Sequence, residues 1–196
     1  NFKTFDEVIP KAYRPGLSYK HDKVASIPTV GYSIPIIELT KAIDEGYFFL
    51  KMKIGQNGTQ EEMLEKDKER LTQIHKAMGG RRTKYTPSGK LPYYIDANGR
   101  YESKDTLLRW LDHAKKIGAY DQIAVVEEPF REDLDIEVHD IEMRLAADES
   151  AHTDEDALQR IEMGYKSIAL KAIAKTMSMT MKIAQIAHER NISCFC

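Results

Sequence analysis

The sequence predicts an α/β protein, an incomplete TIM-like (β/α)7β barrel domain. Two observations carry this prediction: short apolar segments alternate with amphipathic helical segments, and polar residues recur just where the apolar segments end. Strands that alternate with helices of this length pair in parallel through right-handed crossovers. Seven such steps fit a closing barrel better than an open doubly wound sheet, which we keep as the second option.

The strand segments are short and apolar. We expect strands at residues 29–34, 47–54, 92–97, 122–127, 144–148, 167–171 and 192–196. The helical segments place apolar side chains at intervals of three and four residues. We expect helices at residues 35–45, 59–78, 103–117, 134–141, 153–163 and 177–190. Pro35, Ser103 and Thr153 are residue types that open helices, and Gly46 is one that ends them.

Two segments lie outside this alternation. Residues 1–28 hold several prolines and read as an extended lead-in or linker, so the barrel domain is expected at residues 29–196, strands one to seven. A full barrel needs an eighth strand, which we expect beyond the chain. The basic segment 79–91 is rich in turn residues and is expected to be a surface insertion, with an anion-contacting loop as the alternative.

Composition excludes several classes of partner. The chain has 196 residues, a formal net charge of −2 and 42% hydrophobic residues, which suit one globular domain and indicate no nucleic-acid surface. No apolar run approaches the roughly 20 residues of a membrane span. Cys194 and Cys196 are too close in sequence for good disulfide geometry, which favours a reducing, cytoplasmic setting.

Charged residues stand at the ends of five successive predicted strands, and they are the candidate site. They are Lys51 and Lys53, then Asp96 with Asn98, then Glu127, then Asp148, and finally Lys171. The carboxyl ends of barrel strands meet at one mouth, so these side chains are expected to converge. Glu127 is preferred over Glu128 because alternation lets one of the two face the mouth, and Glu128 precedes a proline.

Three carboxylates that converge need a cation between them, because like charges raise one another's pKa. Oxygen ligands without cysteine or histidine favour Mg²⁺, with Mn²⁺ as the alternative. The metal would bind a substrate carboxylate and take up the negative charge that develops when the neighbouring proton leaves. Lysines on either side would move that proton, because nearby cations lower a lysine pKa.

Five motifs, in combination, resemble the enolase superfamily, and within it the muconate lactonizing enzyme subgroup. They are FFLKMKIG at 48–55, YYIDANGRY at 93–101, VVEEPF at 125–130, LAADES at 145–150 and SIALK at 167–171. Asp148 and Lys171, with no histidine in residues 192–196, favour this subgroup over the mandelate racemase subgroup.

The resemblance implies a role for each candidate residue. The implied metal ligands are Asp96, Glu127 and Asp148. Lys53 would be the base on one face of the substrate, and Lys171 the acid or base on the other. Lys51 would touch the substrate carboxylate and depress the pKa of its neighbour. Asn98 is also expected to contact the substrate. Family members carry a capping domain before the barrel, which we expect outside this chain.

The expected function is Mg²⁺-dependent abstraction of the proton next to a substrate carboxylate, through an enediolate. A racemase or epimerase of dipeptides or N-acyl amino acids is the leading hypothesis. A cycloisomerase or β-elimination enzyme uses the same residues and stays open. Schiff-base chemistry at Lys171 and an inactive or metal-binding barrel fragment are further alternatives. The expected partner is a small carboxylate molecule, and a homo-oligomer stays open. Residues 175–178 replace a glycine pair common in the family, which leaves the substrate subclass open.

Overall fold

The computed structural model describes residues 22–196, which form two compact units. The N-terminal unit comprises Ala25–Ile136 with Met143–Leu145, and the C-terminal unit comprises, of the described residues, 22–24, Glu137–Glu142 and Ala146–Cys196. Most of the lead-in predicted at 1–28, residues 1–21, lies outside the described residues. Residues 23–28 hold neither helix nor strand.

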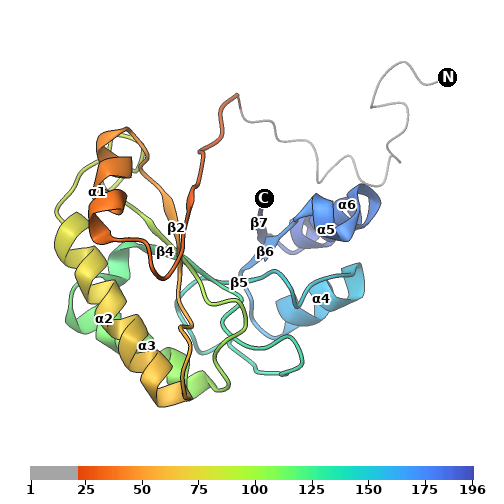
Figure 1. The fold of residues 1–196 in the computed structure, drawn as a ribbon. Coiled ribbons are helices and arrows are strands. Elements are labelled where there is room, and N and C mark those ends of the chain that lie inside the picture. The colour runs from red at the N-terminus through yellow and green to blue at the C-terminus, as the bar shows by residue number, and fades with distance from the viewer. Residues whose placement is uncertain (1–21) are drawn as a thin grey trace. The chain divides into compact units, whose positions relative to one another are not determined.

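The N-terminal unit contains four parallel strands, and each of the first three leads into a helix. The strands are β1 (Thr29–Val30), β2 (Leu50–Lys53), β3 (Tyr93–Asp96) and β4 (Ile123–Glu127). The helices are α1 (Ile36–Asp44), α2 (Gln60–Met78) and α3 (Lys104–Lys116), followed by the 3-10 helix η4 (Tyr120–Gln122). Figure 1 shows α1, α2 and α3 together on one side of β2 and β4, so the apolar helix faces can cover the strands.

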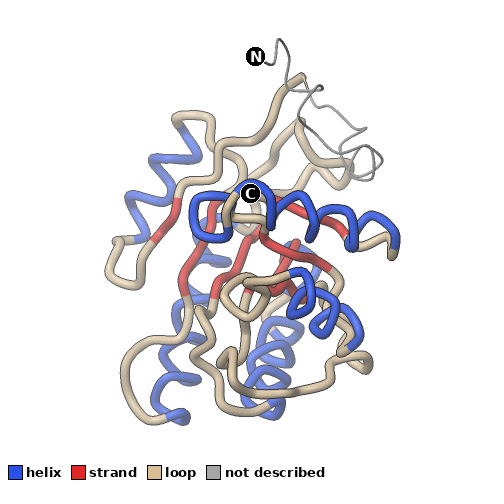
Figure 2. Tube along the Cα trace, turned by 90° about the vertical axis from the view of Figure 1, so that its right-hand side faces the viewer, coloured by secondary structure: helices blue, strands red, loops and turns tan. Residues whose placement is uncertain are grey.

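The C-terminal unit repeats the pattern with shorter strands. Its strands are β5 (Leu145–Ala147), which begins at the unit boundary, β6 (Ser167–Ala169) and β7 (Ser193–Phe195). Its helices are α4 (Asp154–Glu162), α5 (Ala172–Lys175) and α6 (Met177–Glu189). β6 pairs in parallel with β5 and with β7. Figure 2 shows the red strands joined by tan loops to blue helices.

The strands follow chain order from β1 to β7, and helices alternate with them. The pairs β1–β2, β2–β3, β3–β4, β5–β6 and β6–β7 are all parallel. This arrangement confirms the predicted class, an incomplete (β/α)7β barrel domain. Across residues 22–196, no helix combines the length and apolarity that crossing a membrane requires.

The structure differs from the predicted elements in several places. The helix expected at 134–141 is wrong, because these residues form turns and irregular backbone. Residues 134–138 alternate apolar and acidic side chains with a period of two, and the segment contains several β-branched residues and is too short to be stable as a helix by itself. Its buried Val138 instead donates its N–H to the Met163 carbonyl oxygen at 2.8 Å. β1 is shorter than expected, and α5 was not expected.

The helices α2 and α3 begin where the sequence places capping side chains. The Thr59 hydroxyl accepts the Glu62 N–H at 3.3 Å, and the Glu62 carboxylate accepts the Thr59 N–H at 2.9 Å. Ser103 likewise accepts the Thr106 N–H at 3.2 Å, as predicted for a helix start. α2 packs against α3, on which Trp110 is fully buried. Caps and core therefore fix the same two helices behind the strands.

We expect Thr59→Ala to lower the free energy of unfolding by about 1 kcal/mol, because the N-terminal amides of α2 lose their side-chain acceptor. Urea unfolding followed by the fluorescence of Trp110, the single tryptophan of the chain, reports on the neighbouring helix α3. Thr59→Ser keeps the hydroxyl and is the matched control. An equal loss in both variants would show that the hydroxyl does not cap the helix.

Candidate active site

The predicted site residues of the N-terminal unit lie in one row across three neighbouring strands. Lys53 on β2 pairs in register with Asp96 on β3, and Asp96 pairs with Glu127 on β4. Residues in register on parallel strands project to the same face of a sheet, and the strands lie about 4.8 Å apart. The last residue of each strand therefore presents a charged side chain at the same level.

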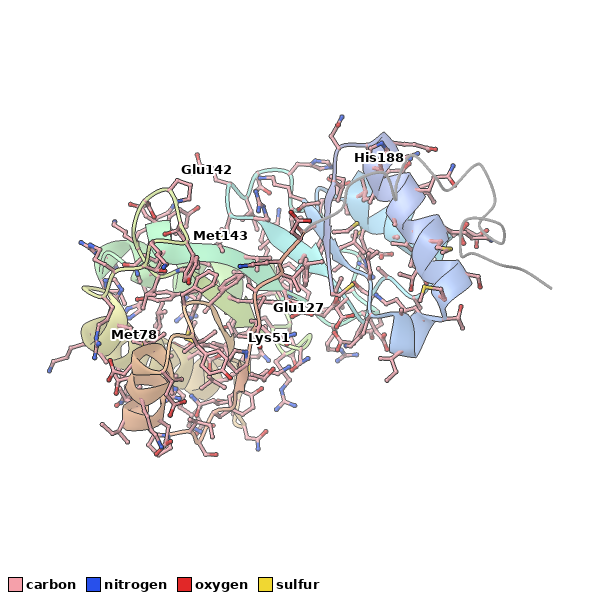
Figure 3. The ribbon with its side chains drawn as sticks, turned by 90° about the horizontal axis from the view of Figure 1, so that it is seen from above. Lys51, Met78, Glu127, Glu142, Met143 and His188 are labelled. Atoms are coloured by element: carbon pink, nitrogen blue, oxygen red, sulfur yellow. The ribbon has the colours of Figure 1, made fainter. Side chains whose placement is uncertain are left out.

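Lys51 and Lys53 compensate the two carboxylates of this row. Lys51 Nζ lies 2.8 Å from Asp96 Oδ2 and also contacts Glu127 Oε2. Lys53 Nζ lies 2.5 Å from the same Asp96 oxygen and contacts Asn98 Oδ1. Figure 3 shows the labelled Lys51 and Glu127 side by side. We call these five residues the lysine–carboxylate cluster.

Two further groups hold the cluster in place. The Tyr94 hydroxyl donates to Glu127 Oε2 at 2.7 Å, and the Lys51 ammonium lies 4.9 Å from the centre of the Tyr94 ring. The Asn98 N–H donates to Asp96 Oδ1 at 2.9 Å. Asn98 has a φ of 45°, in the left-handed region that asparagine tolerates better than most residues. Each oxygen of Asp96 therefore has a donor, which fixes the orientation of this carboxylate.

The pKa values of the two carboxylates in the cluster shift in opposite directions. Burial raises the pKa of Glu127 to about 7, and the charge of Asp96 adds to this effect against the opposing influence of Lys51. Burial would also raise the pKa of Asp96, but hydrogen bonds from Lys51 and Lys53 outweigh it and hold the pKa below the usual value. At neutral pH, Asp96 is ionised while Glu127 can still bind a proton.

The C-terminal unit holds the other predicted residues in a second group, the Asp148 cluster, which consists of Asp148, Glu149, Lys171 and Lys175. Lys171 Nζ contacts Asp148 Oδ2 and lies 3.3 Å from Glu149 Oε1. Lys175 Nζ lies 3.4 Å from Asp148 Oδ1 and donates to the Ala169 carbonyl oxygen at 2.7 Å. Asp148 is thus flanked by two ammonium groups, which lie four residues apart on either end of α5.

The carboxylates raise the pKa values of their lysine partners. For Lys171, burial acts to lower the pKa, but the hydrogen bond and charge of Asp148 outweigh it. For Lys51, burial is likewise outweighed, here by the charge of Glu127 and hydrogen bonds to both carboxylates. A cation that neutralised the carboxylates would reverse this effect, which is what the expected role of a lysine base requires.

Sequence reasoning missed two buried groups. Lys175 belongs to the Asp148 cluster, and its spacing of four residues from Lys171 was the available signal. Glu128 was set aside as a loop residue, yet it is as buried as Glu127. Its φ of 39° lies outside the extended region, so strict strand alternation no longer applies at this position.

The structure brings together all five predicted residues of the N-terminal unit and, separately, Asp148 with Lys171 of the C-terminal unit. Among residues 22–196, no group of three or more His, Cys, Asp or Glu side chains could hold a metal ion. A metal site shared by Asp96, Glu127 and Asp148 therefore stays a prediction.

The fold and these strand-end charges define an α/β-barrel protein in which lysines and carboxylates are in contact at the strand ends. The chain belongs to the family described as enolase C-terminal domain-like, whose model matches residues 36–196. No curated protein sequence matches it.

Solved structures with related names share the fold. A mandelate racemase/muconate lactonizing protein from Herpetosiphon aurantiacus is 18% identical, with a TM-score of 0.70 over 87% of this chain and 45% of that one. The N-succinyl Arg/Lys racemase from Bacillus cereus ATCC 14579 is 18% identical, with a TM-score of 0.68 over 89% and 45%. The 2-chloromuconate cycloisomerase from Rhodococcus opacus 1CP is 22% identical, with a TM-score of 0.66 over 88% and 43%. The chain thus spans less than half the length of these proteins, and the likeness establishes the fold.

The raised pKa of Glu127 predicts a pH dependence of stability for the metal-free protein. The folded protein binds a proton at Glu127 up to about pH 7, whereas an unfolded carboxyl has its usual pKa of 4.5. The contribution of this group to stability is therefore complete below about pH 4.5 and falls as the pH rises to about 7. The slope is at most about 1.4 kcal/mol per pH unit.

Urea unfolding of EDTA-treated wild type and Glu127→Gln between pH 4.5 and 8 checks this expectation. The free energy of unfolding of the wild type should decline relative to that of the variant across the window. Glu65→Gln, which replaces an exposed glutamate of α2, is the matched control and should parallel the wild type. A constant difference between wild type and Glu127→Gln would contradict the assignment.

Proposed function

We propose that the protein removes the proton next to the carboxylate of a small substrate with the help of Mg²⁺, as a racemase or epimerase with two opposed lysines. The observation that carries this proposal is the register of Lys53, Asp96 and Glu127 on three neighbouring strands in a member of this family. An acidic residue and a lysine also pair in the Asp148 cluster. Both proposed bases therefore contact a proposed metal ligand.

The chemistry of the proposed ligands suits a divalent cation. Asp96, Glu127 and Asp148 are each 1% exposed, and buried carboxylates require a compensating positive charge. In this structure lysine ammonium groups supply that charge to all three, and a bound divalent cation would supply it in their place. Carboxylate oxygens are the ligands that Mg²⁺ prefers, and Mn²⁺ suits the same donors. A mandelate racemase/muconate lactonizing protein of this fold from Paracoccus denitrificans PD1222 is known in complex with magnesium.

The residues of the chain would divide the work. When bound, Mg²⁺ would supply positive charge for the substrate carboxylate and for the negative charge that develops on it. Lys53 would take the proton from one face, and Lys171 would return a proton to the other face. Lys51 would hold the substrate carboxylate and lower the pKa of Lys53 once the carboxylate charges are taken up. Asn98, which contacts the Lys53 amine, would orient that amine and meet the substrate.

The substrate class is proposed as a dipeptide or an N-acyl amino acid. The racemase from Bacillus cereus is named for an N-succinyl amino acid, which supports this class. A cycloisomerase or β-elimination enzyme is the second candidate, supported by the name of the 2-chloromuconate cycloisomerase. Both candidates use the same lysines, so product analysis across a panel of N-acyl amino acids, dipeptides and muconates separates them.

We expect the protein to exchange the α-proton of its substrate for deuterium in D₂O, into both epimers. EDTA should abolish the exchange, and added Mg²⁺ should restore it. Lys53→Ala should slow exchange of one epimer by about 10²- to 10⁴-fold, and Lys171→Ala should slow exchange of the other, because each loses its proton-transfer group. Proton NMR of each starting epimer measures the initial rates.

Lys68→Ala is the control, because it removes a lysine amine of α2 that pairs with Glu65 and belongs to neither cluster. We expect this variant to exchange both epimers at the wild-type rate. A fully active Lys171→Ala would overturn the two-base form. Absence of exchange across the whole panel, with Mg²⁺ binding retained in calorimetry, would favour the non-enzymatic alternative, a metal-binding barrel.

A further inference from the structure

Asp67 on α2 is a buried carboxylate that the proposed chemistry does not use. It is 0% exposed and faces the backbone that follows β2. Its Oδ2 atom accepts the Gly55 N–H at 2.7 Å and the Tyr101 hydroxyl at 3.1 Å, and its Oδ1 atom accepts the Gln56 N–H at 3.4 Å. A carboxylate placed in the interior and surrounded by donors organises the groups that donate to it.

The backbone held by Asp67 begins two residues after Lys53. The Ile54 N–H donates to the Asp96 carbonyl oxygen at 2.9 Å, which continues the pairing of β2 with β3 past the last strand residue. At Gly55 the chain turns with a φ of 87°, and a Cβ there would lie 2.5 Å from Arg100 Cβ. The loop after β2 is therefore pressed against the loop after β3.

Tyr101 extends the same network to the third strand end. Its ring is fully buried, and its hydroxyl reaches Asp67 while its N–H donates to the Pro129 carbonyl oxygen at 3.1 Å. Tyr101 also forms a parallel bridge with Phe130, just after β4. Through Gly55 and Tyr101, one carboxylate ties together the loops that follow β2, β3 and β4.

We propose that Asp67 is a positioning residue, which fixes the end of β2 so that the Lys53 amine stays aimed at its place beside Asp96 and Asn98. Its catalytic consequence rests on the proposed function, in which Lys53 serves one face of the substrate. Loss of the anchor would let Lys53 drift while Lys171, in the C-terminal unit, keeps its own contacts. The effect should therefore be specific to one face.

The test compares Asp67→Ala and Asp67→Asn with Leu71→Ala, a fully buried apolar position one turn further along α2. In Asp67→Ala the exchange rate of the epimer served by Lys53 should fall about 10- to 100-fold relative to the other epimer, because small displacements of a catalytic group cost this much. Asp67→Asn keeps one oxygen for Gly55 and Tyr101 and should restore most of the ratio. Leu71→Ala, which only loosens the core, should leave the ratio unchanged.

A second measurement keeps the inference independent of turnover. Reductive ¹³C-methylation labels the lysines, and the signal missing from Lys53→Arg identifies Lys53. Its NMR signal should shift in Asp67→Ala and stay in place in Leu71→Ala and Asp67→Asn. Tyr101→Phe removes one donor to Asp67 and should shift the signal partway, so it replaces Asp67→Ala if that variant fails to fold. A Lys53 signal that stays at the wild-type position when the anchor is removed would overturn the inference. If the wild type shows no deuterium exchange, the proposed function is refuted but the role of Asp67 is not, because the Lys53 NMR signal tests that role without turnover.

Discussion

The compensation of buried negative charge is the constraint on which the candidate site depends. Asp96 and Glu127 lie almost fully buried on neighbouring strands, where uncompensated charges would destabilise the fold. The chain meets this requirement with lysines on the adjacent strand, so that Lys51 touches both carboxylates and Lys53 touches Asp96. Under the proposed function the same contacts prepare catalysis. A divalent cation that takes over the carboxylates would also release the amines from them, which lowers the lysine pKa values when a base is needed.

Strand register decides whether this compensation is possible. Lys53, Asp96 and Glu127 stand at one level because β2, β3 and β4 pair without an offset at their ends. A slip of one residue in any pair would move a charged side chain to the opposite face of the sheet. The hydrogen bonds past the strand ends, from Ile54 to Asp96 and from Ala97 to Glu127, extend the register into the loops. Backbone pairing therefore sets the positions of the charged side chains, and the lysine ammonium groups reach the carboxylates from the neighbouring strand.

Most of this organisation could be predicted from the sequence, because strand and helix periodicity and capping residues are local signals. Thr59, Ser103 and Thr153 mark the helix starts that the structure has. The failures occur where tertiary contacts decide. Residues 134–141 are too short to form a stable helix by themselves, and the buried Val138 forms its hydrogen bond to Met163 from irregular backbone. The contacts of Asp67 could not be predicted either, since a charged residue on a mostly polar helix carries no sign of the loop it meets.

Backbone conformation at the strand ends explains why side-chain alternation does not decide which of Glu127 and Glu128 is buried. Asn98, Glu128 and Lys171 each adopt a left-handed φ, at 45°, 39° and 42°, within two residues of the ends of β3, β4 and β6. Such residues cost about 1–2 kcal/mol each and persist only where surrounding contacts hold them. At β4 the Gly99 N–H donates to the Glu128 carbonyl oxygen at 2.7 Å and supplies part of that hold. The resulting turn allows the consecutive residues Glu127 and Glu128 both to be buried, whereas an extended strand would point them to opposite faces. Left-handed residues at a strand end can thus bring an additional polar side chain into the interior.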